Sequence, residues 1–184
     1  GVDHDLFAAP KERALDLPND GRPIAGFYGS ISEWIDQDLL LDLSQRLPHW
    51  HFVLIGKTEV DVSALKTAPN MTFLGPRAHD ELPRYSQHWT ASILPFKDSP
   101  QIRACNPLKL REYLAAGRPV VSTVFPAATE YCDVISLTNH PGRFAHQLER
   151  ATRLIGRQED LITRVAPETW DARASQVADL LDQL

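Results

Sequence analysis

The sequence of 184 residues has an ordinary globular composition, with 43% hydrophobic and 23% charged residues. This balance excludes a largely disordered chain, and every apolar run is shorter than the roughly 18 residues that a membrane-spanning helix needs. The net charge of −5 argues against a nucleic-acid surface, since binding to phosphate backbones needs clustered Lys and Arg. Two cysteines, Cys105 and Cys132, are too few for a disulfide framework and indicate a reducing compartment.

The hydrophobic pattern predicts short strands that alternate with helices. Residues 1–22 are a polar, turn-rich lead-in, and the first apolar run follows directly. The strands are apolar throughout, which is typical of a parallel sheet covered on both faces. We therefore expect an α/β domain with a doubly wound, Rossmann-like sheet of six parallel strands. The expected strands are 24–29, 52–55, 71–74, 91–94, 120–122 and 134–137, and the expected helices are 36–47, 79–88, 106–117, 141–156, 159–165 and 170–183.

The helix expected at 106–117 carries the strongest functional signal. Asn106 and Pro107 suit its N-cap and first helical position, and Gly117 suits its left-handed end. Lys109 and Glu112 share one face. A helix N-terminus favours an anion, so a lysine in the first turn predicts an anion held by Lys109 and backbone amides together. Glu112 would then accept from hydroxyl groups, which indicates a nucleotide; the alternative is an ordinary surface Lys–Glu pair.

This stretch resembles a known family. The pattern P-x-K-x-x-E-Y-L-A-A-G-x-P-V-V looks like the sugar-donor helix in the C-terminal domain of GT-B glycosyltransferases of the group 1, or family 4, type. The resemblance continues in family order through GFYGSISEWIDQDLL, HFVLIGK, MTFLGPR and ASILPF. It implies that Lys109 contacts the donor diphosphate and Glu112 the ribose. The sugar-donor site then also includes Asn106, Pro107, Leu108, Gly29, Ser30 and Arg77, with the nucleobase held near Arg77 by backbone groups.

The sequence departs from the family pattern at two places. Related enzymes place an Arg and a Lys after the first strand to hold the diphosphate, whereas this chain has G-S-I-S-E-W, so more of that duty falls on Lys109. Ser30 and Glu33 have the spacing of a capping box instead. Many retaining relatives have a glutamate eight residues before the position of Glu112, where this chain has Ala104. The stereochemistry of transfer therefore stays open.

Three weaker candidates have ordinary explanations. Lys57 follows the second strand and is a possible phosphate contact or a solvated lysine. Asp98 is a candidate to approach the donor sugar or a solvated loop residue. His49 and His51 are spaced as two metal ligands, but no third ligand accompanies them, so we expect a loop entering a strand and no metal site.

The resemblance implies that the chain is one lobe of a longer enzyme. Its opening, GVDHDLF, resembles the family's link into the second lobe, so residues 1–22 are the expected inter-lobe lead-in and 23–168 the nucleotide-sugar-binding domain. The C-terminal helix, 169–184, has an apolar stripe, and we expect it to dock on its own domain with Trp170 as anchor. The catalytic groups are expected in the N-terminal lobe.

The implied function is sugar-donor binding in a glycosyltransferase. A sugar would pass from a nucleoside-diphosphate sugar, by preference a UDP-sugar, to a hydroxyl of a sugar or lipid-linked acceptor, with no metal ion or other cofactor. We expect this in the cytoplasm, at the inner face of the membrane through the other lobe. Two alternatives remain: a lobe of a sugar-nucleotide epimerase of the same architecture, and a non-catalytic nucleotide-binding α/β domain.

Overall fold

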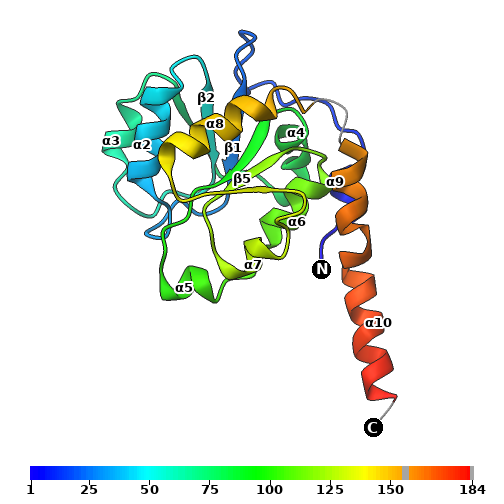
Figure 1. Ribbon diagram of the computed structural model, residues 1–184. Coiled ribbons are helices and arrows are strands. Elements are labelled where there is room, and N and C mark those ends of the chain that lie inside the picture. The colour runs from blue at the N-terminus through cyan, green and yellow to red at the C-terminus, as the bar shows by residue number, and fades with distance from the viewer. Residues whose placement is uncertain (155–157, 183–184) are drawn as a thin grey trace.

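The computed structural model describes residues 1–154 and 158–182, and it confirms the expected α/β architecture (Figure 1). A six-stranded sheet has the order β3-β2-β1-β4-β5-β6, and every pair of neighbouring strands is parallel. The order reverses between β1 and β4, where ligands of doubly wound sheets bind. The strands are β1 (Ile24–Tyr28), β2 (His51–Ile55), β3 (Met71–Gly75), β4 (Ala91–Leu94), β5 (Val120–Ser122) and β6 (Ser136–Leu137).

Helices cover both faces of this sheet (Figure 1). They are α1 (His4–Ala8), α2 (Gln37–Arg46), α3 (Ser63–Lys66), η1 (His79–Glu81), α4 (Pro83–Ser86), α5 (Pro100–Arg103), α6 (Leu108–Ala115), α7 (Pro126–Thr129), α8 (Pro141–Ala151), α9 (Gln158–Val165), η2 (Ala166–Glu168) and α10 (Trp170–Leu181). α2 packs against α3 and α8, whereas α6 packs against α1 and α9. No helix within the described ranges is long and apolar enough to cross a bilayer.

Several predicted boundaries differ from the observed ones. The helix expected at 79–88 is divided into η1 and α4, with Pro83 opening the second piece. The helix expected at 141–156 ends at Ala151, and the last two positions of that prediction lie outside the described residues. The last strand is shorter than predicted because the amides of Val134 and Ile135 bond back to the carbonyl of Tyr131 in a turn. The helices α1, α3, α5 and α7 were not predicted, since four or five residues are too few to show helical periodicity.

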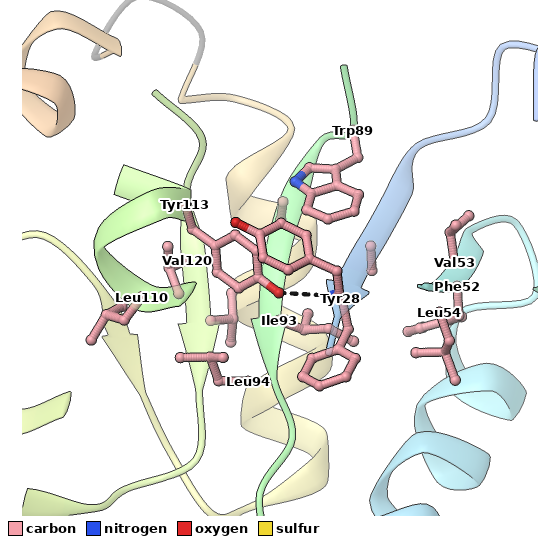
Figure 2. Packing of buried hydrophobic residues seen from close by; sticks show 14 of the residues in the cluster. Tyr28, Phe52, Val53, Leu54, Trp89, Ile93, Leu94, Leu110, Tyr113 and Val120 are labelled. Atoms are coloured by element: carbon pink, nitrogen blue, oxygen red, sulfur yellow. Dashed lines mark hydrogen bonds between the residues drawn. The ribbon is translucent and has the colours of Figure 1, made fainter. Parts of the chain in front are cut away.

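An aromatic cluster fixes α6 on the sheet (Figure 2). The ring of Tyr28, at the end of β1, lies 4.7 Å from that of Tyr113 on α6, and both contact Trp89. The hydroxyl of Tyr113 accepts a hydrogen bond from the Tyr28 amide at 3.0 Å. Gly26 leaves space for this packing, because a Cβ there would lie 1.7 Å from the Trp89 ring. The cluster therefore sets the position of α6 relative to the carboxyl end of β1.

The lead-in is an integral part of the domain. Val2, Phe7, Ala14 and Leu17 are all buried in the hydrophobic core. Val2 forms an isolated parallel bridge with Thr169, and its amide donates to the carbonyl of residue 168 at 2.8 Å. The chain thus enters the domain and leaves for α10 at the same place.

The prediction that α10 docks on its own domain is wrong. Figure 1 shows α10 projecting away from the sheet and its covering helices. None of its residues is buried, and Trp170, the expected anchor, is 58% exposed. The direction of the helix is set at its start, where Thr169 bridges Val2 and its Oγ1 accepts from the amide of Ala172 at 3.1 Å. The last two residues of the chain lie outside the described part.

Candidate functional site

Two glycines bring the carboxyl edge of the sheet close to α6. Gly29 follows β1 and Gly56 follows β2, with φ angles of +132° and +146° that other residues rarely adopt. A Cβ at Gly56 would lie 2.0 Å from the carbonyl oxygen of Gly29. A Cβ at Gly29 would lie 2.8 Å from Nζ of Lys109. The structure therefore places Gly29 and Lys109 in direct contact, as the sequence predicted for one site.

Lys109 is a half-buried cation that has no counterion in the part of the chain that the structure describes. Its Nζ lies 5.4 Å from the centroid of the Phe27 ring and 5.7 Å from that of Phe96. It forms no hydrogen bond or ion pair with any other described residue. Burial lowers the pKa of Lys109 below its usual 10.5, although the charges of Cys105 and Glu112 partly offset this effect. A partly desolvated ammonium of this kind would be stabilised by an anion bound next to it.

Glu112 is buried one turn further along α6, and both of its carboxylate oxygens have partners. Oε2 accepts from the hydroxyl of Tyr28 at 2.8 Å, and Oε1 lies 2.8 Å from Nε2 of His79. Burial raises the pKa of Tyr28 well above its usual value, so this phenol stays neutral and donates. The His79 side chain is 53% exposed and packs edge-on against Phe7. Of the two partners of Glu112, Tyr28 is buried and His79 is largely exposed.

The start of α6 differs from the prediction. Pro107 is the N-cap instead of the first helical residue, and it provides no side-chain cap. Asn106, the predicted N-cap, turns its Oδ1 to Nη1 of Arg111 at 2.7 Å, because a charged guanidinium is a stronger donor than a backbone amide. The amides of Leu108 and Lys109 consequently have no acceptor among the described residues. These first-turn amides and the Lys109 ammonium lie at the same end of the helix.

A second charge network supports the other side of α6. Arg111 is buried and donates from Nε to Glu168 at 2.7 Å, and Glu168 also accepts from Tyr131 at 2.6 Å. Arg164 reaches the second oxygen of Glu168 at 3.2 Å. Neither this network nor the His79–Glu112 contact was predicted from the sequence. One signal in the sequence could have indicated it. Arg111 directly follows Leu110 and precedes Leu114 by three residues, so it lies next to the apolar face of α6, which is buried.

Arg77 and Ser30 lie at the same edge but have different surroundings. The Arg77 side chain turns toward the lead-in, where Nη2 donates to Asp16 at 2.7 Å and Nε to Tyr85 at 2.9 Å. Ser30 lies in an irregular loop, and no helix begins there, so the capping box predicted for Ser30 and Glu33 is wrong. α2 starts later, capped by Asp36 through the amide of Leu39 at 3.0 Å.

The weaker candidates have partners away from Lys109. Lys57 is 74% exposed at its side chain and pairs with Glu59, and Asp98 pairs with Arg103 on the surface. His49 binds Glu149 and His51 binds Asp20, at 2.7 and 2.9 Å, so the two imidazoles have separate roles. Within the described residues, no group of three metal-ligating side chains comes together.

Comparison with known proteins gives the family. The model of the glycosyl transferases group 1 family matches residues 22–153. The chain is 36% identical over 136 residues to the "Putative teichuronic acid biosynthesis glycosyltransferase TuaH" of Bacillus subtilis. The aligned residues are 71% of this chain and 34% of TuaH. The fold matches crystal structures of Anabaena HepE in complex with UDP (TM-score 0.73, 19% identity, 89% of this chain and 49% of HepE). It also matches sucrose-phosphate synthase of Thermosynechococcus elongatus (TM-score 0.74, 18% identity, 100% and 51%).

These relatives are longer than the chain, which spans about a third of TuaH and about half of the two solved structures. The matched segment includes β1 to α8 and with them Gly29, Lys109 and Glu112. The chain belongs to the group 1 glycosyl transferases.

Proposed function

We propose that this chain binds the nucleotide-sugar donor of a glycosyltransferase, and that the donor is a UDP-sugar. The observation that carries the proposal is Lys109, a half-buried ammonium that has no counterion among the described residues and lies beside uncapped first-turn amides and the Gly29 backbone. A diphosphate satisfies all three groups at once. HepE, which shares the fold, was crystallised with UDP and with UDP-glucose, and this supports uridine as the nucleoside.

In this proposal the chain stabilises the departing diphosphate. As the glycosidic bond breaks, negative charge grows on the phosphate oxygens, and Lys109 with the amides of residues 108 and 109 is already oriented toward it. This arrangement requires no metal ion. A ribose hydroxyl donates to Oε1 of Glu112 from the His79 side, while the buried Tyr28 keeps its bond to Oε2. The nucleobase rests against the backbone at Arg77.

The acceptor and the acid–base groups are assigned to the part of the enzyme beyond this chain. The name of TuaH points to a cell-envelope polysaccharide, and a sugar or lipid-linked acceptor hydroxyl is the proposed partner. The free cysteines Cys105 and Cys132 fit a cytoplasmic site of action, at the inner face of the membrane. Catalysis requires that the acceptor be held next to the bound donor. Because this chain does not hold the acceptor, the isolated chain binds the donor but transfers no sugar.

Calorimetric titration with UDP and with pyrophosphate tests the site. Lys109→Ala should weaken binding of both ligands by about 10- to 150-fold, the equivalent of one charge-assisted hydrogen bond. Glu112→Gln should weaken UDP and leave pyrophosphate unchanged, since only UDP carries a ribose. Lys57→Ala is the matched control, because this exposed lysine at the same edge already pairs with Glu59. Equal UDP affinity for the wild type and Lys109→Ala would refute the assignment.

A further inference from the structure

The carboxylate of Glu112 lies between partners from two different elements of the fold. Its Oε2 accepts from the hydroxyl of Tyr28 at the end of β1, and its Oε1 lies 2.8 Å from Nε2 of His79 at the start of η1. The His79 side chain is 53% exposed, whereas that of Glu112 is 4% exposed. The contact therefore joins a buried carboxylate to an imidazole at the surface. The function proposed above assigns the ribose to Glu112 and gives no role to this imidazole.

The two partners together fix the plane of the carboxylate. The last torsion of a glutamate side chain is broad, so a single partner leaves the plane of the carboxylate poorly defined. Here Tyr28 engages one oxygen and His79 the other. Because an ionised carboxylate only accepts, Nε2 of His79 carries the proton and donates it. Each carboxylate oxygen offers about two acceptor positions, and His79 is the one described partner of Oε1, so Oε1 keeps a position for a ligand.

The imidazole of His79 is itself held in place. The centroid of the fully buried Phe7 ring, on α1, lies 5.3 Å from that of His79 and 6.4 Å from that of Tyr28. The contact with His79 is edge-on, with an interplanar angle of 65°, which is a favoured geometry of aromatic pairs. The carbonyl of His79 also accepts from the amide of Leu82 at 3.2 Å. Packing and a main-chain bond thus position the donor that orients Glu112.

A fixed carboxylate matters for a ribose and not for a phosphate. A hydroxyl group that donates to Oε1 needs the free acceptor position in one direction, because hydrogen bonds weaken steeply as their angle departs from linear. Without His79 the carboxylate would rotate about its last torsion, and ligand binding would have to order it. The loss of His79 therefore weakens a ligand that contains ribose and leaves a ligand that contains only phosphate unaffected.

We propose that His79 is a positioning residue for the sugar donor: it orients Glu112 toward a ribose hydroxyl and thereby determines the preference for a nucleotide with an intact ribose. This inference rests on the proposed function, which assigns the ribose to Glu112. It adds a residue that acts through Glu112, whereas Lys109 and the first-turn amides act on the diphosphate. The two parts of the ligand can consequently be tested separately.

Calorimetric titration with UDP, 2′-deoxy-UDP, 3′-deoxy-UDP and pyrophosphate tests this role. The wild type should bind UDP at least about tenfold more tightly than one of the two deoxy forms, as expected for one hydrogen bond to a charged group. His79→Ala should reduce this preference to less than about threefold and leave pyrophosphate affinity unchanged. His79→Gln retains an N–H donor and should restore most of the preference.

His49→Ala is the matched control. The His49 side chain is also more than half exposed and lies 2.7 Å from a carboxylate, that of Glu149, but at the amino edge of the sheet. This variant should leave all four affinities unchanged. A preference retained in His79→Ala but lost in Glu112→Gln would overturn the inference about His79 and leave the proposed function intact.

An equal loss of all four affinities in His79→Ala would also overturn the inference, because it would indicate a purely structural role. A preference that was absent from the wild type, or that persisted in Glu112→Gln, would instead refute ribose binding at Glu112 and the inference about His79 with it.

Discussion

Two amphipathic helices of this chain show different outcomes of the same kind of pattern. α6 buries six of its eight residues, from Leu110 to Ala115, between the sheet and the helices α1 and α9. α10 buries none, and Leu180 and Leu181 are each 64% exposed. Apolar periodicity determines which face of a helix is apolar, but that face becomes buried only if another surface of the protein packs against it. α6 has one within this domain, and the described part of the chain offers none to α10.

The two helices also begin differently. α10 starts with a side-chain cap, since Thr169 accepts from the amide of Ala172. α6 starts at Leu108, its N-cap residue Pro107 provides no side-chain cap, and the neighbouring Asn106 is engaged by Arg111. A missing cap ordinarily costs about 1 kcal/mol of stability. The helix that leaves its first amides uncapped is the one that begins, with Lys109, at the carboxyl edge of the sheet.

The largest effect is expected for Tyr113→Ala on α6. This fully buried ring contacts Tyr28 and Trp89, so its loss leaves a cavity and should lower the free energy of unfolding by about 3–5 kcal/mol. Urea unfolding at neutral pH measures the change. A loss below about 1 kcal/mol would show that α6 is not held on the sheet by this cluster.

The alkaline pH dependence of UDP binding should follow Lys109. Because burial lowers its pKa, the ammonium loses its proton below the usual 10.5, and UDP affinity should fall as the pH rises through that lowered value. Full deprotonation should approach the loss expected for Lys109→Ala, about 1.5–3 kcal/mol. Lys109→Met is the control, since it retains only the pH dependence that belongs to UDP itself. Parallel pH profiles for the two proteins would contradict the role of Lys109.

Glu168→Gln tests the junction between α6 and α10. Burial alone would raise the pKa of Glu168, but hydrogen bonds from Tyr131 and Arg111 lower it below the usual 4.5. The carboxylate therefore contributes stability above pH 4.5, and this contribution is lost as the pH falls through the lowered pKa. At pH 7 the variant should lose about 1–3 kcal/mol, and the difference from the wild type should shrink in acid.

The control for this junction is Asp98→Asn, which removes an exposed pair with Arg103 and should leave the free energy of unfolding nearly unchanged. Chemical denaturation between pH 7 and pH 3 measures both variants. If the loss for Glu168→Gln stayed constant down to pH 3, the stabilisation would come from packing and not from the charge of Glu168.

The smallest effect is expected for Trp170→Ala on α10. This side chain is more than half exposed, so the free energy of unfolding should change by less than about 0.5 kcal/mol. Comparison with Tyr113→Ala in the same urea series measures the contrast between the two helices directly. A loss above about 2 kcal/mol would mean that α10 packs on the domain in solution.

The sequence predicted what depends on neighbours along the chain. Short apolar runs predicted the parallel strands, and Gly117 adopts the expected left-handed conformation, with φ +69°. The amides of Gly117 and Arg118 bond back to Leu114 and Tyr113, as such a helix end requires. The contact of Lys109 with Gly29 could be expected because strand ends and helix starts share one edge of a doubly wound sheet.

Contacts between distant residues could not be predicted in the same way. His79 reaches Glu112 across 33 positions, and Arg111 reaches Glu168 across 57, so no local spacing encodes either pair. The same limitation explains the wrong prediction for Asn106, whose capping role was displaced by Arg111. It also explains α10, because the apolar stripe was visible in the sequence and the surface opposite it was not.

The bridge between Val2 and Thr169 brings the first residues of the sheet domain next to its last ones. The two segments run parallel at this bridge, and the amide of Val2 donates to the carbonyl of residue 168 at 2.8 Å, so the first residues of the sequence lie beside the start of α10. Such adjacency is the condition under which circular permutation succeeds: residues 2 and 168 can be joined by a short linker and the chain reopened in an exposed loop. A permuted domain of this kind would keep the contact between Gly29 and Lys109 intact and would lack α10.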